Sequence, residues 1–191
     1  PIYGGNGIYA GQTRVFEWNG TSWLQKGADI DGEAEGDQAG YAVSMPDANT
    51  VAIGAPFNDG TIVNNDVGHV RIYSWNGSAW MQRGSDIDGM VSNARFGCAV
   101  SMPDANTVAI GAQYNDGNGM TENGLVRVYT WNGTDWVQQG ADLYGEASFD
   151  QSGCSVSMPD PSTVAIGAKN NSGNGAGAGQ VRIYSWSGTT W

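Results

Sequence analysis

The residues best suited to chemistry in this sequence are the carboxylates of an acidic segment, residues 29–37. It places five carboxylates within nine residues, several of them separated by a single residue, with glycines among them. Hard cations such as Ca²⁺ take six to eight oxygen ligands, and glycine allows the sharp turn that a cation-binding loop needs. The sequence therefore predicts a candidate calcium site, with a solvated acidic loop as the alternative; the candidate ligands are Asp29, Asp31, Glu33 and Asp37.

Later copies of this segment carry fewer acids. Met90 and Ala94 replace two carboxylates in the second copy, and Tyr144 replaces one in the third. A cation site that every repeat needed would not lose its ligands in this way. The comparison favours the solvated loop and confines the calcium hypothesis to the first copy.

Four arginines recur in register with the acidic segments and make up half of the eight basic residues: Arg14, Arg71, Arg127 and Arg182. An arginine within a strand that packs on both faces must find an acidic partner, because an unpaired buried charge is costly. Each is expected to pair with a recurring aspartate and to stack on an aromatic ring. The candidate partners are Asp29, Asp86 and Asp142, or alternatively Asp47, Asp104 and Asp160.

All eight tryptophans occupy two repeated positions, Trp18, Trp75, Trp131 and Trp186 and then Trp23, Trp80, Trp136 and Trp191. An exposed tryptophan can stack on a sugar, whereas periodic aromatic residues more often pack between repeated units. Packing is favoured for both sets. The second set, which follows a turn, is the better candidate for a sugar-binding surface.

Four sequons for N-glycosylation are present, at Asn19, Asn76, Asn132 and Asn170. Three of them begin with Asn-Gly between two apolar runs, a pattern that predicts a hairpin with a type I′ turn. A glycan would fit at such an exposed tip, and the alternative is that Asn-Gly serves the turn alone.

Catalysis has little support in the sequence. His69 is the only histidine, and a lone histidine in a strand is usually structural. Nucleophile-elbow, P-loop and paired-cysteine metal motifs do not occur. Cys98 and Cys154 occupy equivalent positions in consecutive repeats, so they are expected to be too far apart for a disulfide. The chain is predicted to be non-enzymatic and to need no cofactor apart from the possible calcium.

The charge composition argues against two classes of binding partner. The 191 residues include 19 Asp and Glu but only 8 Lys and Arg, which gives a net charge of −11. Binding to nucleic acid or to an anionic membrane surface requires basic residues, so neither is expected. No apolar run approaches the roughly 20 residues of a membrane span, so membrane insertion is not expected either.

The elements that position these residues repeat along the chain. Trp-Asn-Gly recurs at steps of 57 and 56 residues, followed by Trp-Ser-Gly 55 residues later, and Val-Ala-Ile-Gly-Ala recurs between them. Each copy contains four short strand patterns and no helical periodicity. Tandem four-stranded units predict an all-β fold of β-propeller blades.

The whole chain, 1–191, is predicted to be one propeller segment of about 3.3 repeats. Its parts are the outer strands of a first blade at 11–27, blades at 40–83 and 97–139, and a blade at 153–191 whose last strand is cut. A closed propeller has at least four blades, so the ring is expected to use further blades of a longer protein or, less favoured, several chains. The first residue, Pro1, also suggests a piece of a longer protein.

Two motifs carry a resemblance to a known family. Phe96-Gly97 is followed fourteen residues later by Gly111-Ala112, and the first copy has Gly40 and then Gly54-Ala55-Pro56. Together they resemble the FG-GAP repeats of integrin-alpha-type β-propellers, and more narrowly those of secreted or surface proteins of marine microbes and algae. The calcium loop of that family does not match here, because the segment between these motifs holds one carboxylate, Asp104.

The resemblance implies an extracellular or cell-surface propeller used for adhesion, recognition or surface architecture. The expected partners are further blades of the same protein or copies of it, and surface proteins or glycans. The sequence thus predicts a structural or adhesive module, with a lectin-like propeller and an accessory domain of a larger enzyme as alternatives.

Overall fold

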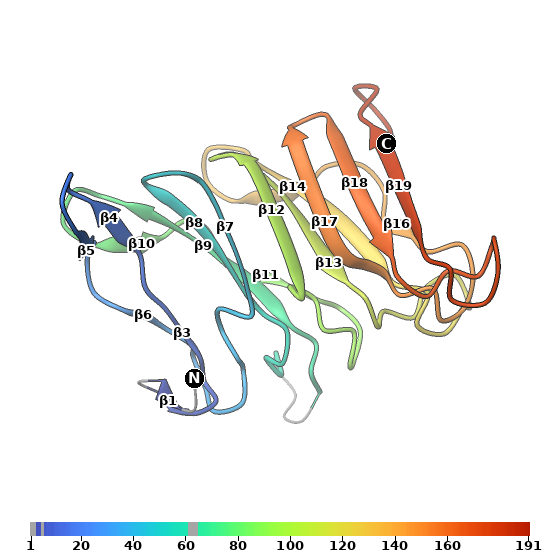
Figure 1. Ribbon diagram of the computed structural model, residues 1–191, viewed down its shortest axis with the longest axis horizontal. Coiled ribbons are helices and arrows are strands. Elements are labelled where there is room, and N and C mark those ends of the chain that lie inside the picture. The colour runs from blue at the N-terminus through green and yellow to red at the C-terminus, as the bar shows by residue number, and fades with distance from the viewer. Residues whose placement is uncertain (1–2, 5, 61–64) are drawn as a thin grey trace.

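The computed structural model describes residues 3–4, 6–60 and 65–191, and these residues form strands and turns without a helix (Figure 1). The prediction of an all-β protein is confirmed. Accordingly, the described part of the chain offers no helix long and apolar enough to cross a membrane.

The first complete sheet is an antiparallel meander whose four strands pair in chain order. A short fifth strand continues its outer edge, because it pairs with the third strand beyond the fourth. The strands are β7 (Ala42–Asp47), β8 (Thr50–Ala55), β9 (His69–Trp75), β10 (Trp80–Gln82) and β11 (Ile87–Asp88).

The second sheet repeats this plan, and the third contains its first three strands. The second sheet consists of β12 (Ala99–Asp104), β13 (Thr107–Ala112), β14 (Leu125–Trp131), β15 (Trp136–Gln138) and β16 (Leu143–Tyr144). The third consists of β17 (Ser152–Asp160), β18 (Thr163–Ala168) and β19 (Gln180–Ser185).

The N-terminal region forms three small ladders, of which two reproduce the outer half of a sheet. β3 and β4 match the two halves of β9, and their partners match β11 and β10. The ladders are β1 (Tyr3–Gly4) with β2 (Gly7–Ile8), β3 (Gln12–Thr13) with β6 (Ile30–Asp31), and β4 (Phe16–Trp18) with β5 (Trp23–Gln25).

Two segments differ from what their turn-forming residues indicate. Pro103 and Asp104 belong to strand β12 rather than to the turn, because a bulge precedes Asp104 and lets it pair with Thr107. The Asn-Gly hairpins have four-residue loops, since Trp131 pairs with Trp136. The asparagine has no positive φ, so the turn is not type I′.

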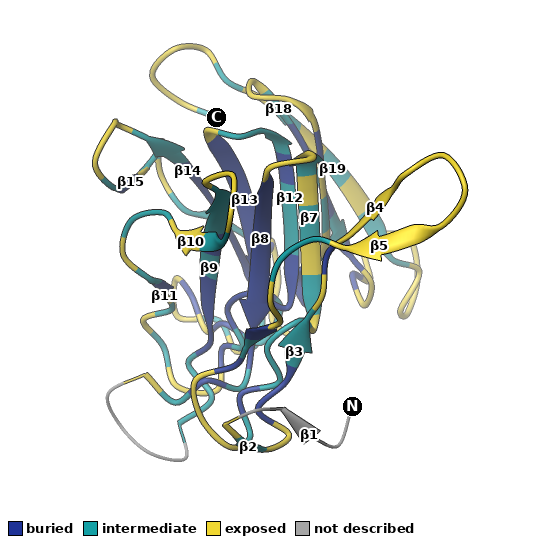
Figure 2. Ribbon diagram, turned by 90° about the vertical axis from the view of Figure 1, so that its left-hand side faces the viewer, coloured by how far each residue is buried: buried dark blue, intermediate teal, exposed yellow. Residues whose placement is uncertain are grey.

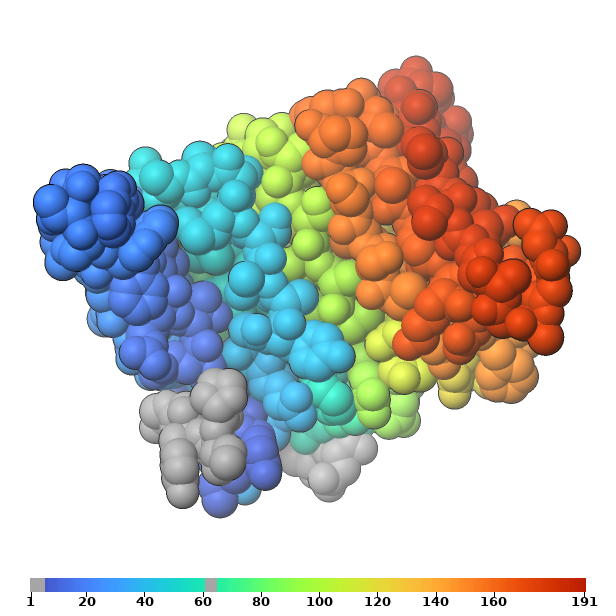
Figure 3. Space-filling model, in the orientation of Figure 1, coloured from blue at the N-terminus to red at the C-terminus, as the bar shows by residue number. Residues whose placement is uncertain are grey.

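The sheets stand side by side in chain order along the long axis of the molecule (Figures 1 and 3). Their central strands β8 and β13 are buried along their whole length (Figure 2). Three hydrophobic clusters fill the spaces between neighbouring units. We call these spaces the first junction (N-terminal region and first sheet), the second junction (first and second sheets) and the third junction (second and third sheets).

The core therefore lies between the units rather than inside any one of them. Strand β18 is buried only at alternate residues, because one face of the third sheet has no neighbour. No closed ring of sheets is formed by the described residues.

Candidate functional site at the repeat junctions

The tryptophans meet in pairs across the three Asn-Gly hairpins and across the equivalent Ser187-Gly188 turn, with ring centroids 5.3–5.6 Å apart. The second member of a pair also reaches the preceding unit. The indole Nε1 of Trp80 donates a hydrogen bond to the Lys26 carbonyl (2.7 Å), and that of Trp136 donates to the Arg83 carbonyl (2.8 Å). Trp191 repeats the contact at the third junction. At the three junctions the tryptophans therefore join consecutive units.

A glycine makes this approach possible. Gly84 has φ +80°, and a Cβ atom there would lie 2.8 Å from Trp131 and 3.0 Å from Trp136. Gly27 and Gly140 meet the tryptophans of the next unit in the same way. The close contact between backbone and indole rings thus requires glycine at this position.

The basic residues that precede two of these glycines, Lys26 and Arg83, also contact tryptophan rings of the next unit. The sequence did not indicate these contacts. The Arg83 guanidinium lies 4.5 Å from the ring centroid of Trp131 and donates to the Ala105 carbonyl in the next unit. Lys26 lies 5.5 Å from the ring of Trp75. Each basic residue precedes its tryptophan by about one repeat, so the sequence pattern did not reveal the contact.

The recurring arginines lie on the third strand of each sheet and face the acidic segments. At the first junction Arg71 binds Asp86 of its own unit (Nε–Oδ2 3.2 Å) and Glu33 of the preceding unit. The Arg71 side chain is 12% exposed, so this charge is largely removed from solvent. One arginine therefore joins carboxylates from two units.

At the second junction Arg127 has one acidic partner among the described residues, Asp142, which it binds through Nε (2.8 Å) and Nη2 (2.9 Å). This bidentate contact lowers the pKa of Asp142 to about 2, helped by hydrogen bonds from Tyr144 and Gln138, and raises that of Arg127. Met90 takes the place of Glu33, and the Arg127 Nη1 is buried without a hydrogen bond.

At the third junction Arg182 binds Glu146 of the preceding unit (3.3 Å) and the Tyr144 carbonyl (3.0 Å). Its guanidinium lies 5.8 Å from the ring of Tyr184, which makes it the one recurring arginine that stacks on an aromatic ring in the described chain. Arg14, in the N-terminal region, is exposed and forms no ion pair with a described residue.

The second set of candidate aspartates lies away from these arginines and serves turns. Each of these aspartates accepts a hydrogen bond from the backbone amide two residues further on. The pairs are Asp47 with Asn49, Asp104 with Asn106, and Asp160 with Ser162. Such Asx turns close the hairpin between the first two strands of a sheet.

The four candidate calcium ligands form contacts with different residues. Asp29 accepts a hydrogen bond from Gln25, and Asp31 accepts one from Gln12 (3.0 Å). Glu33 faces Arg71. Asp37 is 3% exposed and accepts from Asn58 of the next unit (3.1 Å) and from the Ala34 amide (3.1 Å). Among the described residues the structure does not gather these four carboxylates into one cluster, and calcium stays a prediction.

The hairpin asparagines are exposed, and their side chains are oriented alike. Asn76 Oδ1 accepts hydrogen bonds from the Ser78 and Ala79 backbone amides (both 2.9 Å). No described residue accepts a hydrogen bond from the Asn76 Nδ2. Asn19 and Asn132 are arranged in the same way. The nitrogen that would carry a glycan therefore faces solvent. Asn170 is also exposed.

Both cysteines are free thiols. Burial raises the pKa of the Cys98 thiol to about 11, and its Sγ lies 3.4 Å from the Gly111 carbonyl oxygen. Such a thiol is protonated and inert at neutral pH.

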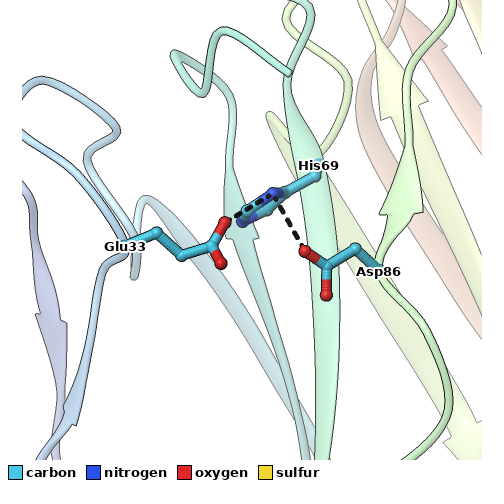
Figure 4. A group of neighbouring side chains, drawn as sticks. All are labelled: Glu33, His69 and Asp86. Carbon is cyan, nitrogen blue, oxygen red and sulfur yellow. Dashed lines mark ion pairs between the residues drawn. The ribbon is translucent and has the colours of Figure 1, made fainter. Parts of the chain in front are cut away.

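His69 is the residue whose surroundings the sequence did not reveal. It begins β9 and is buried between Glu33 and Asp86 (Figure 4). Burial lowers its pKa, although Asp86, Asp88 and Asp37 oppose that effect. The available signal was its departure from the repeat, because the other copies have Gln or Leu at this position.

Comparison of the sequence with protein-family models and with curated proteins finds no match.

Proposed function

We propose that the chain is part of a non-enzymatic structural or adhesive β-propeller in which each sheet, with its short fifth strand, is one blade. The observation that carries this proposal is the outer face of the third sheet. Val181 and Ile183 on β19 are 68% and 71% exposed, whereas their counterparts Val126 and Val128 on β14 are 0% and 2% exposed. Apolar side chains that are exposed on this face but buried on the equivalent face of the second sheet indicate an interface.

The opposite end of the molecule supports the same proposal. Trp18 and Trp23 are 51% and 66% exposed, whereas Trp136, the counterpart of Trp23, is 8% exposed because the preceding unit covers it. Both ends thus expose side chains that a neighbouring unit covers elsewhere. The proposed partners are accordingly further blades of the same protein, or copies of it.

The proposed setting is the cell exterior or cell surface. Four exposed sequon asparagines, a net charge of −11 and the resemblance to FG-GAP repeats favour it. Adhesion to surface proteins or glycans would then use the loops and hairpin tips, because the sheet faces are occupied by neighbouring blades.

Electron microscopy of a lengthened chain tests the propeller. Tandem copies of residues 97–152 would be added until the chain has six or seven repeats. We expect closed rings with one blade per repeat and no exposed end. An open arc or an extended superhelix at every length would reject the propeller proposal.

A glycan-binding function is the alternative, and the exposed Trp18–Trp23 pair favours it, because paired indole rings can stack on sugars. A glycan array probed with the chain and with Trp23→Ala separates the two. Retention of a glycan by the chain and its loss from the variant would support a lectin. The structural proposal predicts no retained glycan at this pair.

A further inference from the structure

One group of side chains combines residues that no other junction brings together. His69 occupies a position that is Gln12, Leu125 or Gln180 in the other copies. Opposite it stands Glu33, whose counterpart at the second junction is Met90. Among the described residues, the first junction is the one place where a histidine faces two carboxylates.

The three side chains point toward one another from different segments (Figure 4). His69 Nδ1 lies 3.8 Å from Glu33 Oε2 and 3.8 Å from Asp86 Oδ2. The three ligand atoms all lie within 4.8 Å of one another. These distances are too long for hydrogen bonds but short enough for the atoms to share one ion.

The imidazole itself indicates a missing ligand. His69 is 3% exposed, and neither ring nitrogen forms a hydrogen bond with a described residue. The ring nitrogens are not among the fully enclosed polar atoms that lack a partner, so they are open to a ligand from outside. The ring also borders a cavity of about 370 Å³ whose lining includes Asn58 and Asp88. The site is therefore polar and accessible, and the imidazole has no hydrogen-bond partner in the described chain.

We propose that Glu33, His69 and Asp86 bind one divalent transition-metal ion, with Zn²⁺ as the representative case. Imidazole nitrogen and carboxylate oxygen are ligands that zinc accepts, and a histidine ligand disfavours the hard ions Ca²⁺ and Mg²⁺. Ligand atoms of a tetrahedral zinc site lie roughly 3.4 Å apart when the bonds are about 2.1 Å long. The observed 3.8 Å separations need only small side-chain adjustments to reach it.

The surrounding charges suit a dication. Two carboxylates, the Arg71 guanidinium and a neutral imidazole sum to one negative charge, and Asp88 lines the same cavity. Arg71 contacts Glu33 and Asp86 and would orient both ligands without itself touching the ion.

The ion would tie two units together. Glu33 belongs to the loop after β6, whereas His69 and Asp86 belong to the first sheet and its outer loop. Three protein ligands leave one position of a tetrahedral ion open toward the cavity, where water would bind. The proposed site is thus a metal clamp across the first junction, absent from the second.

Metal titration of the chelator-treated chain tests this proposal. Co²⁺ binding would be followed by visible absorption, and Zn²⁺ affinity by competition with a chromogenic chelator. The variants are His69→Gln, which installs the residue of two other copies, and Glu33→Gln. The control is Glu146→Gln, which neutralises the equivalent acid at the third junction, where no histidine is present.

We expect one equivalent of metal, a zinc-dependent rise in the unfolding temperature, and an affinity loss of about tenfold or more in both variants but not in the control. Thermal unfolding in chelator establishes that each variant is folded. Failure of the unmodified chain to bind either metal would overturn the proposal. So would unchanged affinity in His69→Gln, or a thiolate–cobalt band, which would assign the metal to a cysteine.

Discussion

The first and second junctions follow one plan but differ in how many polar residues they contain. The first has the larger polar share, with Glu33, Asp37 and His69 close to Arg71 and Asn58. The second has apolar residues at three equivalent positions, Met90, Ala94 and Leu125, and adds Phe96 where the first has Ala39.

The two junctions are nevertheless built on the same strands, the same indole–carbonyl hydrogen bond and the same glycine. Polar and apolar contacts can thus replace each other here, as expected if a buried ion pair and a hydrophobic cluster contribute similarly to stability. The shared features are those that the fold requires, and the variable ones are where specific chemistry can arise.

Phe96→Ala should break the apolar junction most strongly. Phe96 is 1% exposed and belongs to the cluster between the first and second sheets. Removing a buried phenyl ring typically costs about 3–5 kcal/mol, from lost burial and the cavity left behind. Chemical denaturation measures this loss. Phe149→Ala, at a residue that is 57% exposed, is the control and should cost less than about 0.5 kcal/mol. Equal costs for the two variants would refute the assigned core.

Gly84→Ala should be the next most harmful change, because it disrupts what the junctions share. The new Cβ atom would meet Trp131 and Trp136 with φ at +80°, so backbone strain and overpacking add to about 2–3 kcal/mol. Gly77→Ala is the matched control, since its φ is +101° but its Cβ would meet open space. It should cost about 1 kcal/mol. The role of close packing here would be rejected if the two losses were equal.

The Arg127–Asp142 pair should make the second junction sensitive to acid. The folded-state pKa of Asp142 is about 2, below the ordinary 3.8, because Arg127 stabilises the carboxylate. Its contribution is therefore fully present above about pH 4 and is lost as the pH falls toward 2. Asp142→Asn removes this contribution at every pH. The stability curves of the variant and the unmodified chain, from denaturant midpoints, should converge between pH 4 and 2. Parallel curves would contradict the pairing.

Met90→Glu should produce the smallest effect and would make the second junction resemble the first. Met90 is 76% exposed and occupies the position of Glu33 and Glu146, which pair with the equivalent arginines. At the second junction this acid is missing, and the Arg127 Nη1 has no hydrogen bond. A new carboxylate should add about 0.5 kcal/mol at low salt and less at high salt. Met90→Gln controls for loss of the thioether. A gain that is independent of salt would argue against a new ion pair.

The repeat made much of this fold predictable, because a fixed period assigns the same role to Val51, Val108 and Val164 at once. Strand order and the all-β class followed from turn residues and β-branched runs. The junction contacts could not be predicted so directly, because Lys26 meets Trp75 and Arg83 meets Trp131 only when units stack. The His69 group combines one departure from the repeat, His69, with a glutamate that one copy lacks and a recurring aspartate. A sequence pattern alone does not show that these three residues face one another.

We propose that contacts at the junctions stabilise the units and that a further unit covers each end of the molecule. Hydrogen exchange of this chain, and of the same chain extended by one further repeat after Trp191, tests this proposal. We expect rapid exchange of the β18 and β19 amides in the shorter chain and clear slowing of both in the longer one, with β8 and β13 slow in both. Equal protection of β18 and β19 in the two chains would contradict the proposal.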